Sequence, residues 1–505
     1  MPTFAAVDIG ANSVRLKIAR LTRHRLQVLH EDREVTRLGE SVFRSGLLAT
    51  EAIAHTIRVL QRFHRAAQGY GAESVRAVGT SALRDARNAS AFLDWAASAI
   101  GWRVEVISGL EEGRLIHMAV VAATRARSTC ALLLDLGGGS CELTVSDHGD
   151  IRRMFSLPLG AVRLTQEFVR WDPPKKKELQ RLRSYIAEEI ARVQRRVLAS
   201  RIQMAVATSG TAAALAGAHF RTRNPKGGAV PRADLLELTA ALAKLTQLQR
   251  AAIPGIGTRR AEIIVAGAMV YSELLTRLDL PSFHYSPLGL CDGVLAQMSA
   301  DYDGGTPFRR YIDAERRNAL VNTATHYGAD LKFAGQVRDL ALKLFDGMKS
   351  VHRLPNEYRE WLAAAAMLHE VGSFVNRSGR RRHAYYIVCH SEIFGYTVHQ
   401  RHLIAALVRY VGRSQPSPDS RPLRPLAPAE RERVPKAVLL LRLARALNLG
   451  RRGAIKDARV LVRRERVAIK LTAGASGADL EMWAFQKERG YFRTVFGREL
   501  LATLS

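Results

Sequence analysis

Two short segments combine aspartate, glycine and serine in a way that suits phosphate binding. The first covers residues 8–13 with the sequence DIGANS, and the second covers residues 135–140 with the sequence DLGGGS. Glycines at a strand end let successive backbone N–H groups face one concavity, which binds phosphate oxygens without side chains. One copy alone is also typical of a hairpin turn, but two copies at domain-sized separation favour paired phosphate loops. The predicted phosphate-binding residues of the loops are Gly10, Asn12, Ser13, Gly137, Gly138, Gly139 and Ser140.

Three acidic side chains accompany these loops. Asp8 and Asp135 stand at the ends of the preceding strand-like runs, and Glu142 follows the second loop. Carboxylates repel a phosphate at close range, whereas Mg²⁺ prefers oxygen ligands and bridges to phosphate. The sequence therefore predicts Asp8, Asp135 and Glu142 as metal-associated residues.

The segment from Ser108 to Ile116, SGLEEGRLI, opens a helix after a short strand-like run. Ser108 and Glu111 have the spacing of a capping box, which assigns Glu111 to the helix N-terminus. Glu112 is left either as a favourable partner of the helix dipole or as a functional carboxylate. If this turn faces the phosphate loops, Glu112 is placed to take a proton from water that attacks a terminal phosphorus, as a general base.

Arg84 lies in a further strand-to-helix passage, VGTSALRDA over residues 78–86. A helix N-terminus with a guanidinium nearby makes an anion site, which predicts Arg84 as a phosphate contact. The alternative is a surface ion pair of Arg84 with Asp85 or Glu111.

The elements around these residues alternate between strand and helix. Each phosphate loop joins two strand-like runs, and the repeat predicts two similar α/β domains that face each other across a cleft. Helices are expected at 51–67, 89–99 and 176–200, and strands at 74–78, 103–107 and 204–207.

The second half of the chain changes character after the linker-like stretch 301–307. Residues 311–447 have helical spacing, and Val/Ile/Arg alternation over 457–471 is followed by a helix near 478–489. We expect an α/β protein with two lobes, a helical domain and a small C-terminal α/β unit. The predicted domains are 1–125, 126–303, 304–447 and 448–505.

Composition limits the partners and the compartment. The chain of 505 residues carries 76 Lys+Arg against 47 Asp+Glu, a formal charge of +29, which favours polyanionic partners or reflects an arginine-rich proteome. Its four cysteines form no CxxC pair, and no apolar run reaches the roughly 18 residues that span a bilayer. We expect a cytoplasmic protein without a membrane partner, and no recognised nucleic-acid-binding motif indicates DNA or RNA.

Five segments, in this order and spacing, resemble the exopolyphosphatase and guanosine-pentaphosphate phosphohydrolase family of the actin-like ATPase superfamily. They read AAVDIGANSVRL, VGTSALRDARNA, VEVISGLEEGRLI, LLLDLGGGSCEL and ATSGT. The resemblance covers nearly the whole chain, because AMLHEVG at 366–372 and the residues after it look like the HD-like domain of longer members. It implies two actin-like (ribonuclease H-like) domains, Mg²⁺ with K⁺ as a further ion, and a homodimer.

By the same resemblance, Glu112 corresponds to the catalytic base, Asp135 and Glu142 to magnesium-associated carboxylates, and Arg84 to a phosphate contact. The HD-like domain is not expected to bind a metal, because Glu370 follows His369 where a metallohydrolase needs His-Asp and further ligands. His369 and His383 are interpreted as packing or polyanion-contact residues.

Clusters of basic residues suggest a path for a long polyanion, although each alone is also typical of a solvated face. The predicted path residues are Lys175, Lys176, Lys177, Arg380, Arg381, Arg382 and His383.

The favoured function is magnesium-dependent hydrolysis of terminal phosphate from inorganic polyphosphate. Removal of the 5′ γ-phosphate of guanosine pentaphosphate at the same site is the first alternative. A nucleotide-gated binding protein or chaperone-like ATPase without polyphosphate turnover is the second, and a nucleic-acid scaffold with a degenerate core is the third.

Overall fold

The computed structural model describes residues 1–124, 128–222, 228–474 and 477–504. The chain divides into two compact units, Met1–Arg310 and Tyr311–Ser505, each with its own core. The predicted domain limit at residues 125/126 falls outside the described residues.

The first unit begins with a sheet whose described strands run in the order β3-β2-β1-β4-β5. β1 pairs with β2 in antiparallel fashion and with β4 in parallel fashion. The strands are β1 (Thr3–Ile9), β2 (Ser13–Thr22), β3 (Arg25–Val35), β4 (Ser74–Gly79) and β5 (Val104–Val106). The helices that follow in the chain are α1 (Val42–Ser45), α2 (Thr50–Gly69), α3 (Ser81–Asp85), α4 (Ala89–Ile100) and α5 (Gly109–Ala123).

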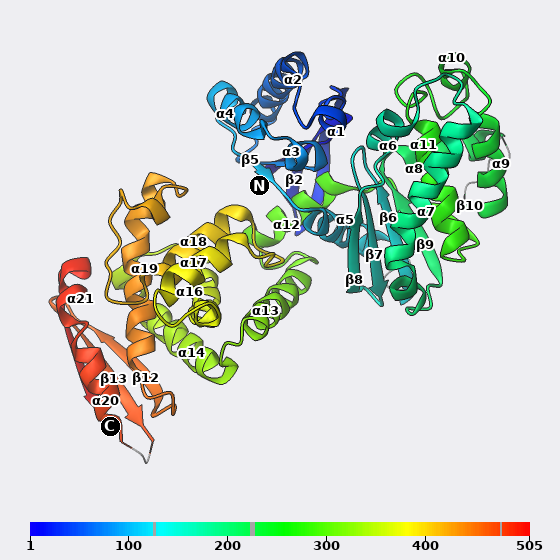
Figure 1. Cartoon of the computed structure of the whole chain (residues 1–505). Helices are drawn as coiled ribbons and strands as arrows, with labels where there is room; N and C mark the ends of the chain where they lie inside the picture. The colour runs from blue at the N-terminus through cyan, green and yellow to red at the C-terminus, as the bar shows by residue number, and fades with distance from the viewer. Residues whose placement is uncertain (125–127, 223–227, 475–476, 505) are drawn as a thin grey trace. The chain divides into compact units, whose positions relative to one another are not determined.

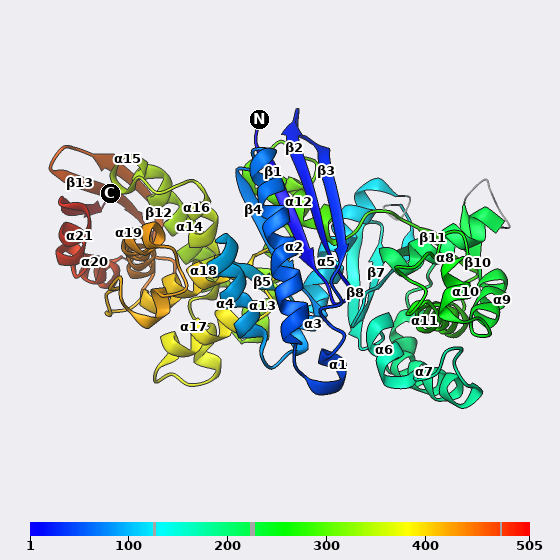
Figure 2. The same cartoon turned by 90° about the horizontal axis from the view of Figure 1, so that it is seen from above.

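Both faces of this first sheet are covered. Apolar side chains of α2 and α4 share a core with Ala5, Val7 and Ile9 of β1, and α2 runs along the sheet in Figure 2. The opposite face of β1 packs against α12 (Leu290–Tyr302), where the rings of Phe4 and Tyr302 are in edge-to-face contact. The period-two alternation of β1 thus separates two helical layers.

The second sheet has the described order β10-β11-β9-β6-β7-β8. Its strands are β6 (Cys130–Leu136), β7 (Cys141–Asp147), β8 (Asp150–Leu157), β9 (Met204–Thr208), β10 (Ala229–Pro231) and β11 (Ser282–Tyr285). Its helices are α6 (Ala161–Phe168), α7 (Lys176–Leu198), α8 (Ser209–Thr222), α9 (Arg232–Leu242), α10 (Gln247–Ala251) and α11 (Ile264–Arg277). We call the first sheet with α1–α4 lobe I, and the second sheet with α6–α11 lobe II (Figure 1).

The second unit is mainly helical, and its core is formed by buried side chains of its helices and of its sheet. The helices are α13 (Arg309–His326), α14 (Leu331–Gly347), α15 (Lys349–His352), α16 (Glu357–Leu368), α17 (Arg380–His390), α18 (Val398–Tyr410), α19 (Pro428–Ala446), α20 (Asp479–Gln486) and α21 (Arg489–Phe496). Short 3-10 turns are η2 (Val371–Phe374) and η3 (Arg421–Leu423). β12 (Ile455–Val462), β13 (Arg466–Ala473) and β14 (Glu499–Leu504) form its sheet.

These elements confirm the predicted class of α/β lobes followed by a helical region and a small α/β unit. The four cysteines are free thiols. Among the described residues, no helix has the length and apolarity needed to cross a membrane.

Candidate active site

The two DxGxxS segments form the same turn in the two lobes. Gly10 donates its N–H to the Ser13 carbonyl at 3.1 Å, and Gly137 donates to the Ser140 carbonyl at 3.0 Å. Each turn joins two antiparallel strands, β1 to β2 and β6 to β7. The repeat read from the sequence is therefore also a repeat of backbone structure.

Both turns border one cavity, and Glu112 lies on its wall. The cavity is lined by Asp8, Gly10, Ala11, Asn12, Ser13, Arg15, Thr80, Ser81, Glu112, Ile116, Asp135, Leu136, Gly137, Gly138, Ser140, Ser209, Gly210, Arg260, Gly289 and Leu290. The structure thus brings the loops, Asp8, Glu112 and Asp135 together, whereas Glu142 and Arg84 lie outside this lining. Gly139 is absent from this lining, because Phe43 and Ser81 of lobe I cover it.

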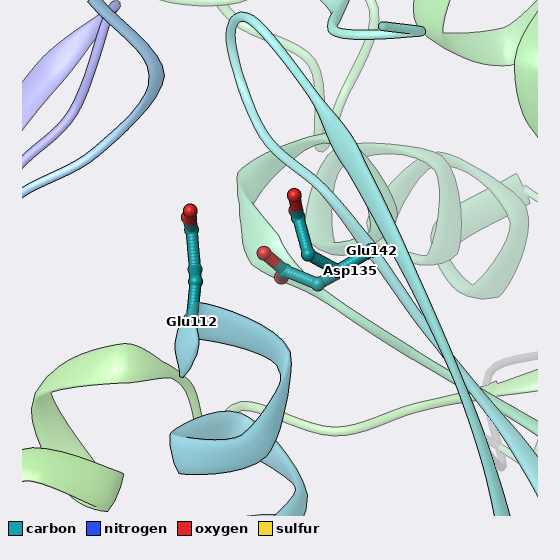
Figure 3. A group of neighbouring side chains, drawn as sticks. All are labelled: Glu112, Asp135 and Glu142. Carbon is teal, nitrogen blue, oxygen red and sulfur yellow. The ribbon is translucent and has the colours of Figure 1, made fainter. Parts of the chain in front are cut away.

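Three buried carboxylates form a cluster at this cavity. Ligand atoms of Glu112, Asp135 and Glu142 lie within 4.8 Å of one another, a group that excludes Asp8. Figure 3 shows Glu112 rising from the first turn of its helix, beside the strands that carry the other two. Ser156 donates to Oε1 of Glu142 at 2.8 Å, and the Thr208 hydroxyl donates to Asp135.

The charges of this cluster are poorly compensated. Burial raises the pKa of Glu112 to about 7, with Arg84 opposing the rise and Asp135 and Asp8 adding to it. Burial also raises the pKa values of Asp135 and Glu142, and for Glu142 the Glu112 charge adds to the effect. Glu142 Oε2 is buried without a hydrogen-bond partner. An orphaned carboxylate oxygen beside two others fits a hard divalent cation such as Mg²⁺, which would lower all three pKa values.

Arg84 is the cation that touches this cluster. Its Nη1 donates to Oε2 of Glu112 at 3.0 Å and to the Ile107 carbonyl at 2.9 Å, and its Nη2 donates to Ser140 Oγ at 3.1 Å. The alternative surface pairs of Arg84 are not formed, because Asp85 pairs with Arg163 and Glu111 with Arg114.

Helix α5 packs closely against lobe II because small residues of α5 face that lobe. This close packing places Glu112 beside the lobe II carboxylates. A Cβ on Gly109 would lie 2.2 Å from Ser156 Oγ and 2.9 Å from Glu142 Oε1, so this position accepts only glycine without movement. Ser108 caps the helix by accepting from the Glu111 N–H at 3.1 Å, as its spacing predicts. The cap and the close approach together fix the direction of the first turn.

Two residues of the first loop, Asn12 and Asp8, also line the cavity. Nδ2 of Asn12 is buried and makes no hydrogen bond in the protein, so this donor is free for a ligand oxygen. Asp8 lines the cavity, and burial raises its pKa to about 6, with Arg15 lowering it and Asp135 raising it.

Sequence reasoning missed Arg15 and Arg33, two arginines beside the loops. Arg15 lines this cavity and an adjoining one, whose wall also includes Arg33 and Tyr285. Burial, with Arg15 and Arg259 nearby, lowers the pKa of Arg33 to about 10, and its Nε and Nη2 are buried without partners. Burial, together with Arg33 and Arg15, lowers the pKa of Arg260 to about 9.

The repeat contained a signal for one of these arginines. In the antiparallel registers, Arg15 pairs with Asp8 just as Glu142 pairs with Asp135. The first loop thus carries a cation where the second carries a carboxylate.

The predicted polyanion path lies elsewhere on the chain. Lys175, Lys176 and Lys177 are exposed at the start of α7, and Lys175 Nζ stands 3.5 Å from the Trp171 ring centroid. Arg380, Arg381, Arg382 and His383 form the first turn of α17 in the second unit.

His369 is a buried residue of the second unit. Its Nδ1 lies 2.7 Å from the Ala366 carbonyl and its ring packs against Phe333, while burial lowers its pKa to about 4. The carboxylate cluster of the first unit is the one metal-type grouping among the described residues.

Comparison with known families gives two matches along the chain. The model of the Ppx/GppA phosphatase family matches residues 17–301, and that of Ppx/GppA phosphatase domain III matches residues 316–482. The first match contains the second loop, Glu112 and Arg84, whereas the first loop precedes its start.

Individual relatives agree with these matches. The chain is 34% identical over 288 residues to Exopolyphosphatase 2 of Mycobacterium tuberculosis, covering 54% of this chain and 90% of that protein. An exopolyphosphatase from Cytophaga hutchinsonii aligns with a TM-score of 0.56 and 25% identity over 59% of this chain and 97% of that one. The Aquifex aeolicus member of the Ppx/GppA family aligns with a TM-score of 0.50 and 29% identity over 58% and 96%.

Proposed function

Because the chain belongs to the Ppx/GppA phosphatase family, we propose that it hydrolyses phosphoanhydride bonds and removes the terminal phosphate of inorganic polyphosphate. The observation that carries this proposal is one cavity that both glycine loops line together with Glu112, Asp8 and Asp135. Glu112 is bound by Arg84 and belongs to the cluster with Asp135 and Glu142. Terminal phosphate is a compact anion, and a cavity with backbone donors on two sides suits it.

Each group has a task that its position supports. Backbone N–H groups of the two loops bind the oxygens of the terminal phosphoryl group, and the Asn12 amide adds a donor. Arg84 neutralises charge that develops on the phosphoryl oxygens, since its guanidinium already reaches Ser140 on the second loop. Glu112 accepts the proton of the attacking water, and burial raises the proton affinity of its carboxylate above that of an exposed glutamate.

Mg²⁺ fits the acidic side of the cavity. Asp135 and Glu142 would hold it, with the unpartnered Oε2 of Glu142 as one ligand atom and Asp8 facing the same cavity. When bound, the ion would offset the negative charge of substrate and carboxylates together. Ser156 and Thr208 orient the two carboxylates.

The adjoining arginine cavity extends this site. Arg15 borders both cavities, and Arg33 lies in the second, whose wall also carries Glu31, Asp32 and Asp292; the unpartnered Nε and Nη2 of Arg33 would bind the next phosphates of a chain. Tyr285 and Leu288 line the same space and offer an apolar surface to a nucleoside. This feature favours guanosine pentaphosphate as the second candidate substrate.

The proposal is tested by phosphate release from long-chain polyphosphate and from guanosine pentaphosphate. Glu112→Gln removes the base at nearly constant size, and we expect it to lower kcat about 10²- to 10⁴-fold for both substrates. Glu188→Gln is the matched control, because Glu188 is an exposed carboxylate of α7. Full activity of the Glu112 variant would refute the base assignment.

The same assays separate the alternatives. Turnover of guanosine pentaphosphate alone would establish the second candidate instead of the first. Tight ATP binding without phosphate release from either substrate would favour a nucleotide-gated binding protein. The cytoplasmic location and the homodimer stay predictions.

A further inference from the structure

The three glycine carbonyls of the second phosphate loop all accept hydrogen bonds from residues at the start of α6. The N–H groups of Ala161 and Val162, at the start of α6, donate to the Gly137 and Gly138 carbonyls at 3.0 and 2.8 Å. The Gly139 carbonyl accepts from a side chain instead, Nε of Arg163, at 2.7 Å. Since C=O and the following N–H point in opposite directions in a trans peptide, these bonds turn the next N–H groups away from α6.

Three N–H groups are oriented in this way, those of Gly138, Gly139 and Ser140. Within the described residues, none of the three donates to a loop or turn partner. Gly138 and Ser140 line the cavity, whereas Arg163 does not. Arg163 therefore acts on the loop from behind.

The same guanidinium also reaches across to lobe I. Nη2 of Arg163 pairs with Asp85 of α3, and its Cζ lies 4.2 Å from the centroid of the Phe43 ring in α1. Asp85 directly follows Arg84, whose Nη2 donates to Ser140 Oγ at 3.1 Å. Consecutive residues of α3 thus both act on the end of this loop: Arg84 binds the Ser140 hydroxyl directly, and Asp85 acts on the Gly139 carbonyl through Arg163.

The first loop is built differently at the equivalent position. There the Asn12 carbonyl accepts from the backbone N–H of Arg37 at 3.1 Å, and the Ala11 carbonyl accepts from the Gly39 N–H at 2.8 Å. Both donors belong to the same lobe as the loop. Only the second loop has a carbonyl whose donor depends on partners from the opposite lobe.

We propose that Arg163 is a positioning residue that couples closure of the two lobes to the orientation of the second phosphate loop. This inference rests on the proposed function, since it assigns the loop to a phosphoryl group. With Asp85 and Phe43 in place, the guanidinium is held at the Gly139 carbonyl and the Ser140 N–H is fixed on the opposite side of that peptide. With the lobes apart, the Gly139 peptide loses the donor that fixes it.

The experiment measures the affinity for tripolyphosphate by calorimetry, together with kcat and KM for phosphate release. We expect Arg163→Ala to weaken tripolyphosphate binding about tenfold, because the charge-assisted hydrogen bond that fixes the Gly139–Ser140 peptide, and with it the Ser140 N–H, is lost. Arg163→Lys should recover part of this loss, since one ammonium can reach Gly139 or Asp85 but lacks the planar fork that serves both. Asp85→Asn should weaken binding less and add little to Arg163→Ala.

Arg44→Ala is the matched control. Arg44 also spans the lobes, donating twice to the Gln166 carbonyl of α6 at 3.2 and 3.0 Å, but it touches no loop carbonyl. We expect its tripolyphosphate affinity to stay within about twofold of wild type. Thermal unfolding of each variant reports the fold, and Arg163→Lys and Asp85→Asn carry the test if Arg163→Ala does not fold.

The outcomes separate this inference from the proposed function. Wild-type affinity in Arg163→Ala, or an equal loss in Arg44→Ala, would overturn the positioning role while leaving hydrolysis intact. Binding without phosphate release by wild type would refute hydrolysis alone, and the affinities would still decide the role of Arg163. Failure of wild type to bind tripolyphosphate would overturn both.

Discussion

Arg84 holds Glu112 by an ion pair of 3.0 Å, which opposes the effect of burial on the Glu112 carboxylate. The pair lies where helix α3 of lobe I meets the first turn of α5. Its geometry makes the proton affinity of Glu112 depend on a residue from another segment, and this dependence can be measured.

Removal of Arg84 is expected to shift the pH dependence of activity. Arg84 lowers the pKa of Glu112, so Arg84→Ala raises that pKa above its value near 7. A base works only when deprotonated, so activity is lost as pH falls through the pKa, and the acid limb moves to higher pH. The measurement is kcat/KM against pH for wild type and the variant. Arg84→Lys keeps a positive charge, so the acid limb of its kcat/KM profile should lie close to that of wild type. An acid limb at the wild-type pH in Arg84→Ala would contradict the assignment.

Binding of a divalent cation is expected to release protons near neutral pH. In the metal-free cavity the pKa of Glu112 lies near 7 and those of Asp135 and Glu142 are raised. A cation stabilises the ionised forms, lowers these pKa values and displaces the protons. Calorimetric titration with Mg²⁺ in buffers of different ionisation enthalpy gives the number released. Glu142→Gln should reduce both affinity and proton release; magnesium binding with no change in proton uptake would argue against this cluster as the site.

Gly109→Ala is expected to destabilise the first unit and to lower activity. The new Cβ would meet Ser156 Oγ at 2.2 Å, forcing α5 away from β8 and moving Glu112. Overpacking of this kind typically costs about 1–3 kcal/mol of unfolding free energy. Gly69→Ala, near which a Cβ would find no atom within 4 Å, is the control for thermal unfolding. Equal melting temperatures of the two variants would show that α5 has more room than the structure gives it.

Neutralising Arg380, Arg381 and Arg382 together is expected to affect long substrates only. Burial and the charges of Arg380 and Arg442 lower the pKa of Arg381, which indicates a strongly cationic surrounding. A polymer that contacts this turn releases counterions, so replacing the three arginines by glutamine should weaken the salt dependence of KM for long-chain polyphosphate. KM for tripolyphosphate is the internal control. Unchanged salt dependence and unchanged chain-length preference would remove these residues from the path.

Much of the candidate site could be predicted from local sequence. The turns at Gly10 and Gly137 depend on hydrogen bonds within four residues, and the Ser108 cap spans three. Such short-range interactions leave a recognisable spacing. Arg84 was predicted as an anion contact for the same reason, because it stands in the first turns after a strand.

Other residues left no usable local signal. Arg33 is one of several charged residues in a long strand, and Arg163 is one of many arginines in the chain. Arg33 is distinguished by side-chain nitrogens that are buried without a partner, and Arg163 by its hydrogen bond to the Gly139 carbonyl. Both properties arise from segments that are far away in the sequence.

The sequence by itself determined the paired strand-turn-strand units, the capped helix that carries Glu112, and the family to which they belong, because neighbouring residues decide turns and caps. Only the tertiary structure decided that Glu112 joins Asp135 and Glu142, that Arg84 pairs with Glu112, and that Arg163 holds the second loop. The physical reason is that desolvation and Coulomb interactions depend on every atom packed around a group. Those atoms come from strands and helices that meet only when the two lobes fold against each other.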